Sequence, residues 1–167
     1  PPPGAREDVR RFGMHGVPVG AKGSLTEEAE YRLSFLSSKN VAALHTHDTQ
    51  RRTLVSFKTC KETLGPAGKA VKSYYAKTAL LWHCQETPAD KWISITYGLY
   101  MLLDSLEEAV ATCRLSFFSW TELNLLGQST EAKLMAMAEA IILIQRYQTR
   151  LRAHRLTTQL KSEMNSC

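Results

Sequence analysis

Two histidines and one carboxylate stand close together in the sequence, at His45, His47 and Asp48. Imidazole and carboxylate groups both bind zinc, so a metal site is one interpretation of this spacing. Polar residues also occur in front of helices, where they cap the free backbone amides. A helical pattern follows directly, so we favour a helix cap and expect no zinc ion here.

No other pattern in the chain is typical of catalysis, and we expect no catalytic residue in it. The chain has no phosphate-binding loop and no nucleophile elbow. It also lacks the Asp-x-Asp or Glu-x-Asp pair that holds two magnesium ions during nucleotidyl transfer. The four cysteines form no CxxC pair, which argues against a cysteine-based zinc site. We expect Cys60, Cys84 and Cys113 to be reduced and mostly buried, in a protein of the cytosol or nucleus.

Positive charge is the main electrostatic feature of the chain. Its 167 residues carry a formal net charge of +5, which favours polyanions without identifying one. Basic side chains recur in the last helical segment, and the usual role of such a run is a solvated face. Contact with the backbone of RNA or DNA, or with acidic lipid, is the functional alternative. The candidates for nucleic-acid contact are Arg51, Arg52, Arg146 and Arg150.

The elements that must position these residues are mostly helical. Apolar and polar side chains alternate along residues 31–35, which predicts a short strand pair with residues 17–19. From residue 48 onward, apolar residues recur at helical spacing. We therefore predict a mainly α fold of four to five helices, over residues 39–44, 48–64, 74–86, 92–113 and 129–161. The expected helix caps are Asp48 or Thr49, Ser73 and Ser129, and Arg114–Leu126 is expected to be an apolar loop.

The helix over residues 74–86 is apolar on nearly all sides. A helix without a polar face belongs in the centre of a bundle. We therefore expect Leu80, Leu81 and Trp82 to be buried together with Leu103 and Leu106. The last helix is expected to face the core with a stripe of Leu134, Met137, Ile141 and Ile144.

Three parts are expected along the chain: a loose segment over residues 1–16, a helical domain over 17–127, and a long helix and tail over 128–167. The sequence begins with Pro1, so we expect an N-terminal part of the protein to precede it. No run approaches the roughly 20 apolar residues that a transmembrane helix needs, so we expect no membrane span.

Five segments of the chain resemble, in the same order, the sequence pattern of one family. The motifs V-P-V-G, E-W-R-[LI]-S-F (here with tyrosine in place of tryptophan), S-Y-H-x-K-T-x-x-L-W-x-C, E-x-P-x-x-x-W, and N-Y-F-I-P with N-L-[LF] are typical of Mab-21-like proteins, the superfamily that includes cyclic GMP–AMP synthase. The matching segments here are Val17–Gly20, Glu30–Phe35, Ser73–Cys84, Glu86–Trp92, and Phe117-Phe118 with Asn124–Leu126. The resemblance implies the C-terminal helical lobe, HhH/H2TH-like, of a nucleotidyltransferase fold.

The resemblance also implies a nucleotide site, because relatives that make cyclic dinucleotides hold ATP or GTP with this lobe. Arg32 could stack on a base and fork onto a phosphate. Tyr74 could stack on a base, and helix amides at Ser73 favour an anion. The structural alternative is that these three side chains only pair, fill space and cap. The implied nucleotide-binding residues are Arg32, Ser34, Lys58, Ser73, Tyr74 and Lys77.

Two features depart from the family pattern. Lys39 stands where the cyclising enzyme carries a glutamate, which implies either another nucleotide preference or a lost pocket. In cyclic GMP–AMP synthase a zinc-binding insertion with one histidine and three cysteines grips DNA. The corresponding interval here, from His45 to Arg51, is short and has no cysteine, so that mode of DNA binding is not expected.

Three functions remain open. The chain is the lobe of a cyclic GMP–AMP synthase-like receptor, or of a Mab-21-like pseudoenzyme that acts in protein interactions or development, or it is a free-standing helical interaction domain. The first function implies as partners an N-terminal nucleotidyltransferase lobe, ATP and GTP, and double-stranded nucleic acid. It also implies Mg²⁺ or Mn²⁺ as a cofactor, bound by that other lobe. Whether the whole protein is an enzyme depends on the acidic residues of that lobe.

Overall fold

The computed structural model describes residues 15–17, 32–34, 46–118 and 120–164. The chain divides into two compact units, Pro1–Thr46 and His47–Cys167, and each is described by itself. In the first unit, strand β1 (His15–Val17) pairs antiparallel with strand β2 (Arg32–Ser34), with Val17 opposite Arg32. The predicted strand pair is therefore confirmed, with β1 starting earlier than expected. The helix predicted over residues 39–44 lies outside the described residues.

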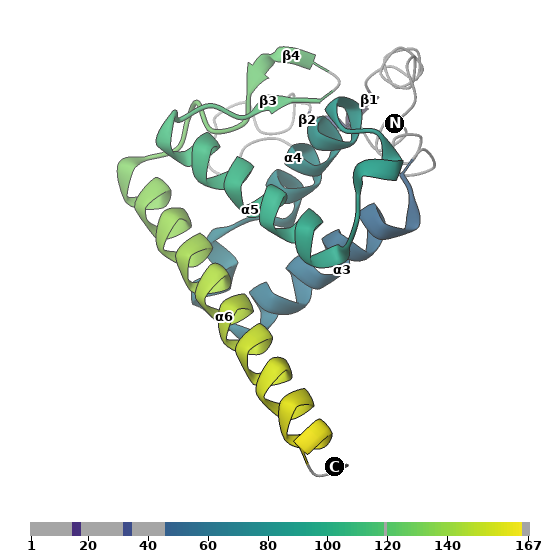
Figure 1. Ribbon diagram of the computed structural model, residues 1–167. Coiled ribbons are helices and arrows are strands. Elements are labelled where there is room, and N and C mark those ends of the chain that lie inside the picture. The colour runs from purple at the N-terminus through teal and green to yellow at the C-terminus, as the bar shows by residue number, and fades with distance from the viewer. Residues whose placement is uncertain (1–14, 18–31, 35–45, 119, 165–167) are drawn as a thin grey trace. The chain divides into compact units, whose positions relative to one another are not determined.

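Four α-helices make up most of the described part of the second unit (Figure 1). They are α3 (Asp48–Thr63), α4 (Ser73–Glu86), α5 (Ile95–Ala111) and α6 (Glu131–Met164). Two short 3₁₀ helices, η2 (Ala67–Ala70) and η3 (Ala89–Lys91), stand in the connections before and after α4. The prediction of a mainly α fold is confirmed.

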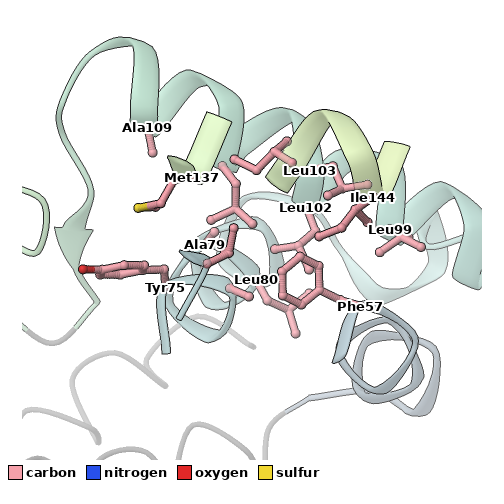
Figure 2. Close-up of a cluster of buried hydrophobic side chains, with 14 of the residues drawn as sticks. Phe57, Tyr75, Ala79, Leu80, Leu99, Leu102, Leu103, Ala109, Met137 and Ile144 are labelled. Carbon is pink, nitrogen blue, oxygen red and sulfur yellow. The ribbon is translucent and has the colours of Figure 1, made fainter. Parts of the chain in front are cut away.

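Helices α3 and α5 each pack against the other three helices of this unit, and α5 supplies much of the core. Its buried side includes Leu99, Leu102, Leu103 and Leu106. The first three of these leucines lie near Phe57 of α3 and Ile144 of α6 (Figure 2). The prediction that α4 is central is wrong. Although α4 is rich in apolar residues, it packs against α3 and α5 and leaves Lys77 exposed. Its His83 Nε2 reaches the Met101 carbonyl oxygen at 3.1 Å and contacts Ser105 Oγ, which fixes α4 on α5.

The predicted loop over 114–126 contains a small antiparallel hairpin, so that prediction is wrong. Strand β3 (Ser116–Phe117) pairs with strand β4 (Trp120–Asn124). The Asn124 Oδ1 accepts hydrogen bonds from the amides of Leu115 (2.9 Å) and Leu126 (3.1 Å), and its Nδ2 donates to the Cys113 carbonyl at 2.9 Å. The Asn124 side chain therefore helps to close the hairpin through three hydrogen bonds. The spacing of apolar residues in the sequence does not indicate these bonds.

Leu80, Leu103 and Leu106 are in the core as predicted, whereas Leu81 and Trp82 are only half-buried, which corrects that part of the prediction. Trp82 does not join that core. Its Nε1 donates to the Ser116 carbonyl at 2.9 Å, and its ring meets Phe118 edge-on at 5.3 Å between centroids. Trp82 therefore ties α4 to the hairpin.

Replacing Trp82 with phenylalanine is expected to lower the free energy of unfolding by about 1 kcal/mol, because the ring contact survives while the hydrogen bond to Ser116 is lost. Urea unfolding followed by circular dichroism measures this change. Trp120 on β4 is 38% exposed, so Trp120→Phe is the control and should change stability by less than about 0.5 kcal/mol. Equal effects of the two substitutions would contradict the role given to Trp82.

Helix α6 packs with the stripe that the sequence predicted. Met137, Ile141 and Ile144 are buried and Leu134 is half-buried. One turn further on, Gln148 Nε2 lies 2.6 Å from Cys60 Sγ and links α6 to α3. Beyond that point α6 extends past the other helices (Figure 1), and residues 152–159 are exposed. Among the described residues, no helix is both long and apolar enough to cross a bilayer.

The thiols follow the prediction in two of three cases. Cys60 and Cys84 are buried, and burial raises the pKa of the Cys84 thiol to about 12. Cys113 is exposed, which corrects the prediction that it is mostly buried. Its φ of 52° ends α5 in a left-handed turn, closed by hydrogen bonds from Cys113 N to Val110 O and from Arg114 N to Ala109 O. This helix-terminating turn directs the thiol outward.

Candidate functional site

The start of α4 is joined to the end of α3 by one polar contact. Lys61 Nζ, in the last turn of α3, donates to Ser73 Oγ, the first residue of α4, at 3.1 Å. Both side chains are half-buried. An ammonium group thus stands directly at the N-terminal end of a 14-residue helix.

The connection between the two helices fixes this contact. Gly65 has a φ of +58° and ends α3, and η2 then lies against the last turn of that helix. A Cβ atom at Gly68 would overlap the carbonyl oxygen of Lys61 and lie 2.8 Å from its carbonyl carbon. Glycine allows this approach because it has no Cβ atom, so η2 can lie close to Lys61 in the connection that leads to α4.

The first turn of α4 favours an anion. No side chain caps its amides, and it holds no acidic residue. The Tyr75 N–H donates to the Lys72 carbonyl at 3.0 Å, and the earlier N–H groups together with the helix dipole give this end a partial positive charge. The prediction that Ser73 caps α4 is wrong: Lys72 occupies the cap position, and Ser73 is the first helical residue. Its hydroxyl instead accepts the hydrogen bond from Lys61.

Two further lysines belong to this end of the helix pair. Lys58 stands one helical turn before Lys61 on α3 and is half-buried, and Lys77 stands one turn after Ser73 on α4 and is exposed. Residues three or four apart share a helix face. Lys58 therefore lies on the same face of α3 as Lys61, and Lys77 lies on the same face of α4 as Ser73. Lys61 is not among the nucleotide-binding residues that the family resemblance implied. Its position three residues after Lys58, on the same helix face, could have indicated it.

Tyr74 is less open than the sequence implied. Its half-buried ring packs against the Tyr75 ring, with centroids 4.3 Å apart and planes tilted by 51°. Burial raises the pKa of the Tyr74 hydroxyl, and the neighbouring Tyr75 raises it further. The phenol therefore stays protonated at neutral pH and can donate a hydrogen bond, while Tyr75 restricts the ring.

Arg32 and Ser34 lie on β2, where they pair with Val17 and His15 of β1. They belong to the first compact unit, whereas the lysines and Ser73 belong to the second. That Arg32 and Lys77 face one ligand therefore stays a prediction. Lys39 lies outside the described residues.

The histidine group in front of α3 caps the helix, as expected, but through a different residue. His47 is the cap, instead of Asp48 or Thr49. Its Nδ1 accepts from Thr49 N at 3.5 Å, and Gln50 Oε1 accepts from His47 N at 2.7 Å. His45 lies outside the described residues. Within the described part of the chain, no three His, Cys, Asp or Glu side chains gather as a metal site would require.

The four candidate arginines for nucleic-acid contact are all exposed. Arg51 and Arg52 lie in the first turn of α3, and Arg52 Nε pairs with Asp48 Oδ2 at 2.8 Å across one turn. Arg146 and Arg150 lie on α6. Exposure leaves these charges able to meet a polyanion, and it is also what a solvated face would show.

Two comparisons with known proteins agree on the kind of chain this is. Residues 49–142, from the start of α3 into α6, match the family described as Mab-21 protein HhH/H2TH-like domain. The protein named cyclic GMP-AMP synthase-like receptor 2 of Drosophila melanogaster is 28% identical over 116 residues, which cover 67% of this chain and 24% of that relative. The match thus spans about a quarter of the relative's length.

Proposed function

This chain belongs to the Mab-21 family, and from that membership we propose that it is the helical lobe of a cyclic GMP–AMP synthase-like receptor that contacts the phosphates of ATP or GTP at the start of α4. A nucleotidyltransferase lobe outside this chain would be its partner. The whole protein would make a cyclic dinucleotide from nucleoside triphosphates. The similarity to a protein named as such a receptor supports this assignment.

The observation that carries the proposal is the arrangement of Lys61 and Ser73 at an uncapped helix N-terminus. Free amides and an ammonium group are the donors that bind phosphate oxygens best. Because Lys61 holds the Ser73 hydroxyl in place, the oxygen, the amides and the charge form one preorganised group. Lys58 and Lys77 would add charge from the neighbouring turns.

Each further residue would have its own role in this proposal. Arg32 would approach the same ligand from β2, with Ser34 beside it, and fork onto a phosphate. Tyr74 would donate a hydrogen bond from its hydroxyl and stack its ring on a base. The Mg²⁺ or Mn²⁺ ion that neutralises the phosphates would be held by carboxylates of the nucleotidyltransferase lobe outside this chain. Among the residues that the structure describes, no three His, Cys, Asp or Glu side chains gather as a metal site would require.

Two further parts of the proposal, contact with nucleic acid and the cellular compartment, are based on exposed arginines and on free thiols. Exposed arginines at Arg51, Arg52, Arg146 and Arg150 are proposed to contact double-stranded nucleic acid through its phosphates. The free thiols of Cys60, Cys84 and Cys113 are in keeping with a reducing compartment, so we propose the cytosol or nucleus.

Removing either partner of the α3–α4 contact is expected to weaken nucleotide binding about tenfold, because one charge-assisted interaction with a phosphate is lost. Calorimetry with ATP and GTP on the full-length protein measures this for Lys61→Ala and Ser73→Ala. Arg32→Ala should weaken binding by a similar factor if β2 faces the same ligand. Lys91→Ala, which removes an exposed lysine of η3, is the control and should bind like the wild type.

Unchanged binding in Lys61→Ala and Ser73→Ala, with the wild type binding ATP or GTP, would contradict the site while leaving the receptor assignment intact. A wild-type protein that binds neither nucleotide would contradict the receptor itself. The lobe would then be a retained scaffold, and the family's role in protein interaction would become the working hypothesis. Lys39→Glu adds a further arm, because it should change the preference between ATP and GTP if that position contacts the base.

A further inference from the structure

The inner side of α6 changes from apolar to basic where the helix leaves the core of its unit. The buried stripe on this side ends with Ile144, and the half-buried Gln148 continues it one turn later. The next positions at the same helical spacing are Arg152 and Arg155, and both are exposed. The side of α6 that packs on the core therefore carries arginines beyond the core.

A second pair of exposed arginines lies on the opposite side of α6. Arg146 and Arg150 are four residues apart and share one helix face, as Arg152 and Arg155 do. From the period of an α-helix, the two pairs lie roughly 170° apart around the helix axis. We call Arg146 and Arg150 the outer pair, and Arg152 and Arg155 the inner pair.

The last part of α6 is a helical arm with positive charge on both sides. Residues 152–159, which we call the arm, are exposed and extend past the other helices (Figure 1). No acidic residue occurs in the sequence between Glu139 and Glu163. Like charges three or four residues apart on a helix repel each other, and a bound anion would remove this repulsion. The two arginine pairs therefore indicate an anionic partner.

The shape of this partner follows from the placement of the two pairs. A lipid surface is flat and would leave the arginine pair on the far side of the helix in water. An acidic protein groove for a helix needs several apolar anchors, and Leu156 is the one large apolar side chain among residues 152–159. The major groove of double-stranded DNA has phosphates along both walls, and its width of about 12 Å admits an α-helix.

We propose that the arm lies in the major groove of B-form DNA, with the outer pair on the phosphates of one strand and the inner pair on those of the other. This inference rests on the proposed contact with nucleic acid and specifies the duplex and the element that binds it. Double-stranded RNA has a deep and narrow major groove, so the arm selects DNA. Because the contacts are to phosphates, binding depends on salt and little on base sequence.

Fluorescence anisotropy of the full-length protein with labelled duplexes of about 20 base pairs, two helical turns, tests the proposal. The wild type should bind DNA about tenfold more tightly than RNA of the same sequence. Arg150→Ala, from the outer pair, and Arg152→Ala, from the inner pair, should each weaken DNA binding about tenfold. Each should also lower the slope of log affinity against log salt by about 1, because one phosphate contact is lost.

Lys133→Ala is the matched control, because it removes an exposed lysine near the start of the same helix. Its affinity for DNA and its salt slope should equal those of the wild type. Competition then identifies the groove. Methyl green, which occupies the major groove, should displace the protein from DNA, whereas netropsin, which occupies the minor groove, should not.

The outcomes separate this inference from the proposed function. Equal affinities for DNA and RNA, a loss confined to one of the two arginine pairs, or displacement by netropsin alone would overturn the placement in the major groove while leaving the contact with nucleic acid intact. A wild type that binds neither duplex would contradict that contact itself. Vesicle binding through anionic phospholipid that both variants abolish, with DNA binding unchanged, would overturn the proposal in favour of a membrane.

Discussion

Replacing Phe57 with alanine is expected to lower the free energy of unfolding by about 3–5 kcal/mol. The Phe57 side chain on α3 is fully buried, and Figure 2 places it beside the apolar residues of α5. Because α3 packs mainly on α5, the substitution removes aromatic contacts at the junction of these helices. It also leaves a cavity that the neighbouring helices can only partly close.

Val55→Ala is the matched control for Phe57→Ala. Val55 lies two positions earlier on the same helix and is 61% exposed, so its truncation should change stability by no more than about 0.5 kcal/mol. Chemical unfolding of the three proteins, with the transition midpoint and slope both recorded, measures the difference. Comparable losses in the two variants would show that α3 does not pack on α5 through Phe57.

Gly68→Ala is expected to destabilise the chain by about 3 kcal/mol, at the upper end of overpacking effects. The added methyl group would overlap the main-chain carbonyl of Lys61, and a main-chain atom in a helix cannot turn away as a side chain can. Relief requires η2 to move from α3, which also moves the start of α4. The same substitution should therefore weaken nucleotide binding in the full-length protein if the proposed site is correct.

Gly127→Ala separates a steric effect from a general intolerance of alanine. A Cβ atom at Gly127 would lie 3.3 Å from Asn124 Nδ2 and 3.4 Å from the Asn124 carbonyl oxygen, so a shift of a few tenths of an ångström accommodates it. We expect it to change stability by less than about 0.5 kcal/mol, measured by thermal unfolding next to Gly68→Ala. A Gly68→Ala protein as stable as the wild type would contradict the close packing of η2 on α3.

Helix positions and the family were predictable because their signals are local. The inner stripe of α6, with Met137, Ile141 and Ile144, follows directly from the period of an α-helix. The pairing of β1 with β2 likewise follows from alternation along Arg32–Ser34. The family motif that covers α4 predicted Ser73 and Tyr74 as nucleotide-binding residues from the sequence alone.

Contacts between distant residues required the fold. The hairpin of β3 and β4 depends on Asn124, whose amide closes it by hydrogen bonds to Leu115, Leu126 and Cys113. Nothing in its apolar sequence distinguishes a strand from a loop. Trp82 looked like a core residue because apolar neighbours surround it in the sequence, yet its partner is the hairpin.

The sequence by itself determined which segments are helices, which side of α6 meets the core, and to which family the chain belongs. Those properties depend on the order of side chains along one segment. The tertiary structure decided that α3 and α5, and not α4, contact all the other helices, and that Lys61 holds Ser73. Lys61 and Ser73 are twelve residues apart, and the connection between them includes η2, which Gly68 allows to lie against α3. That close approach is a steric property of the folded chain, because it arises only when two remote segments share the same space.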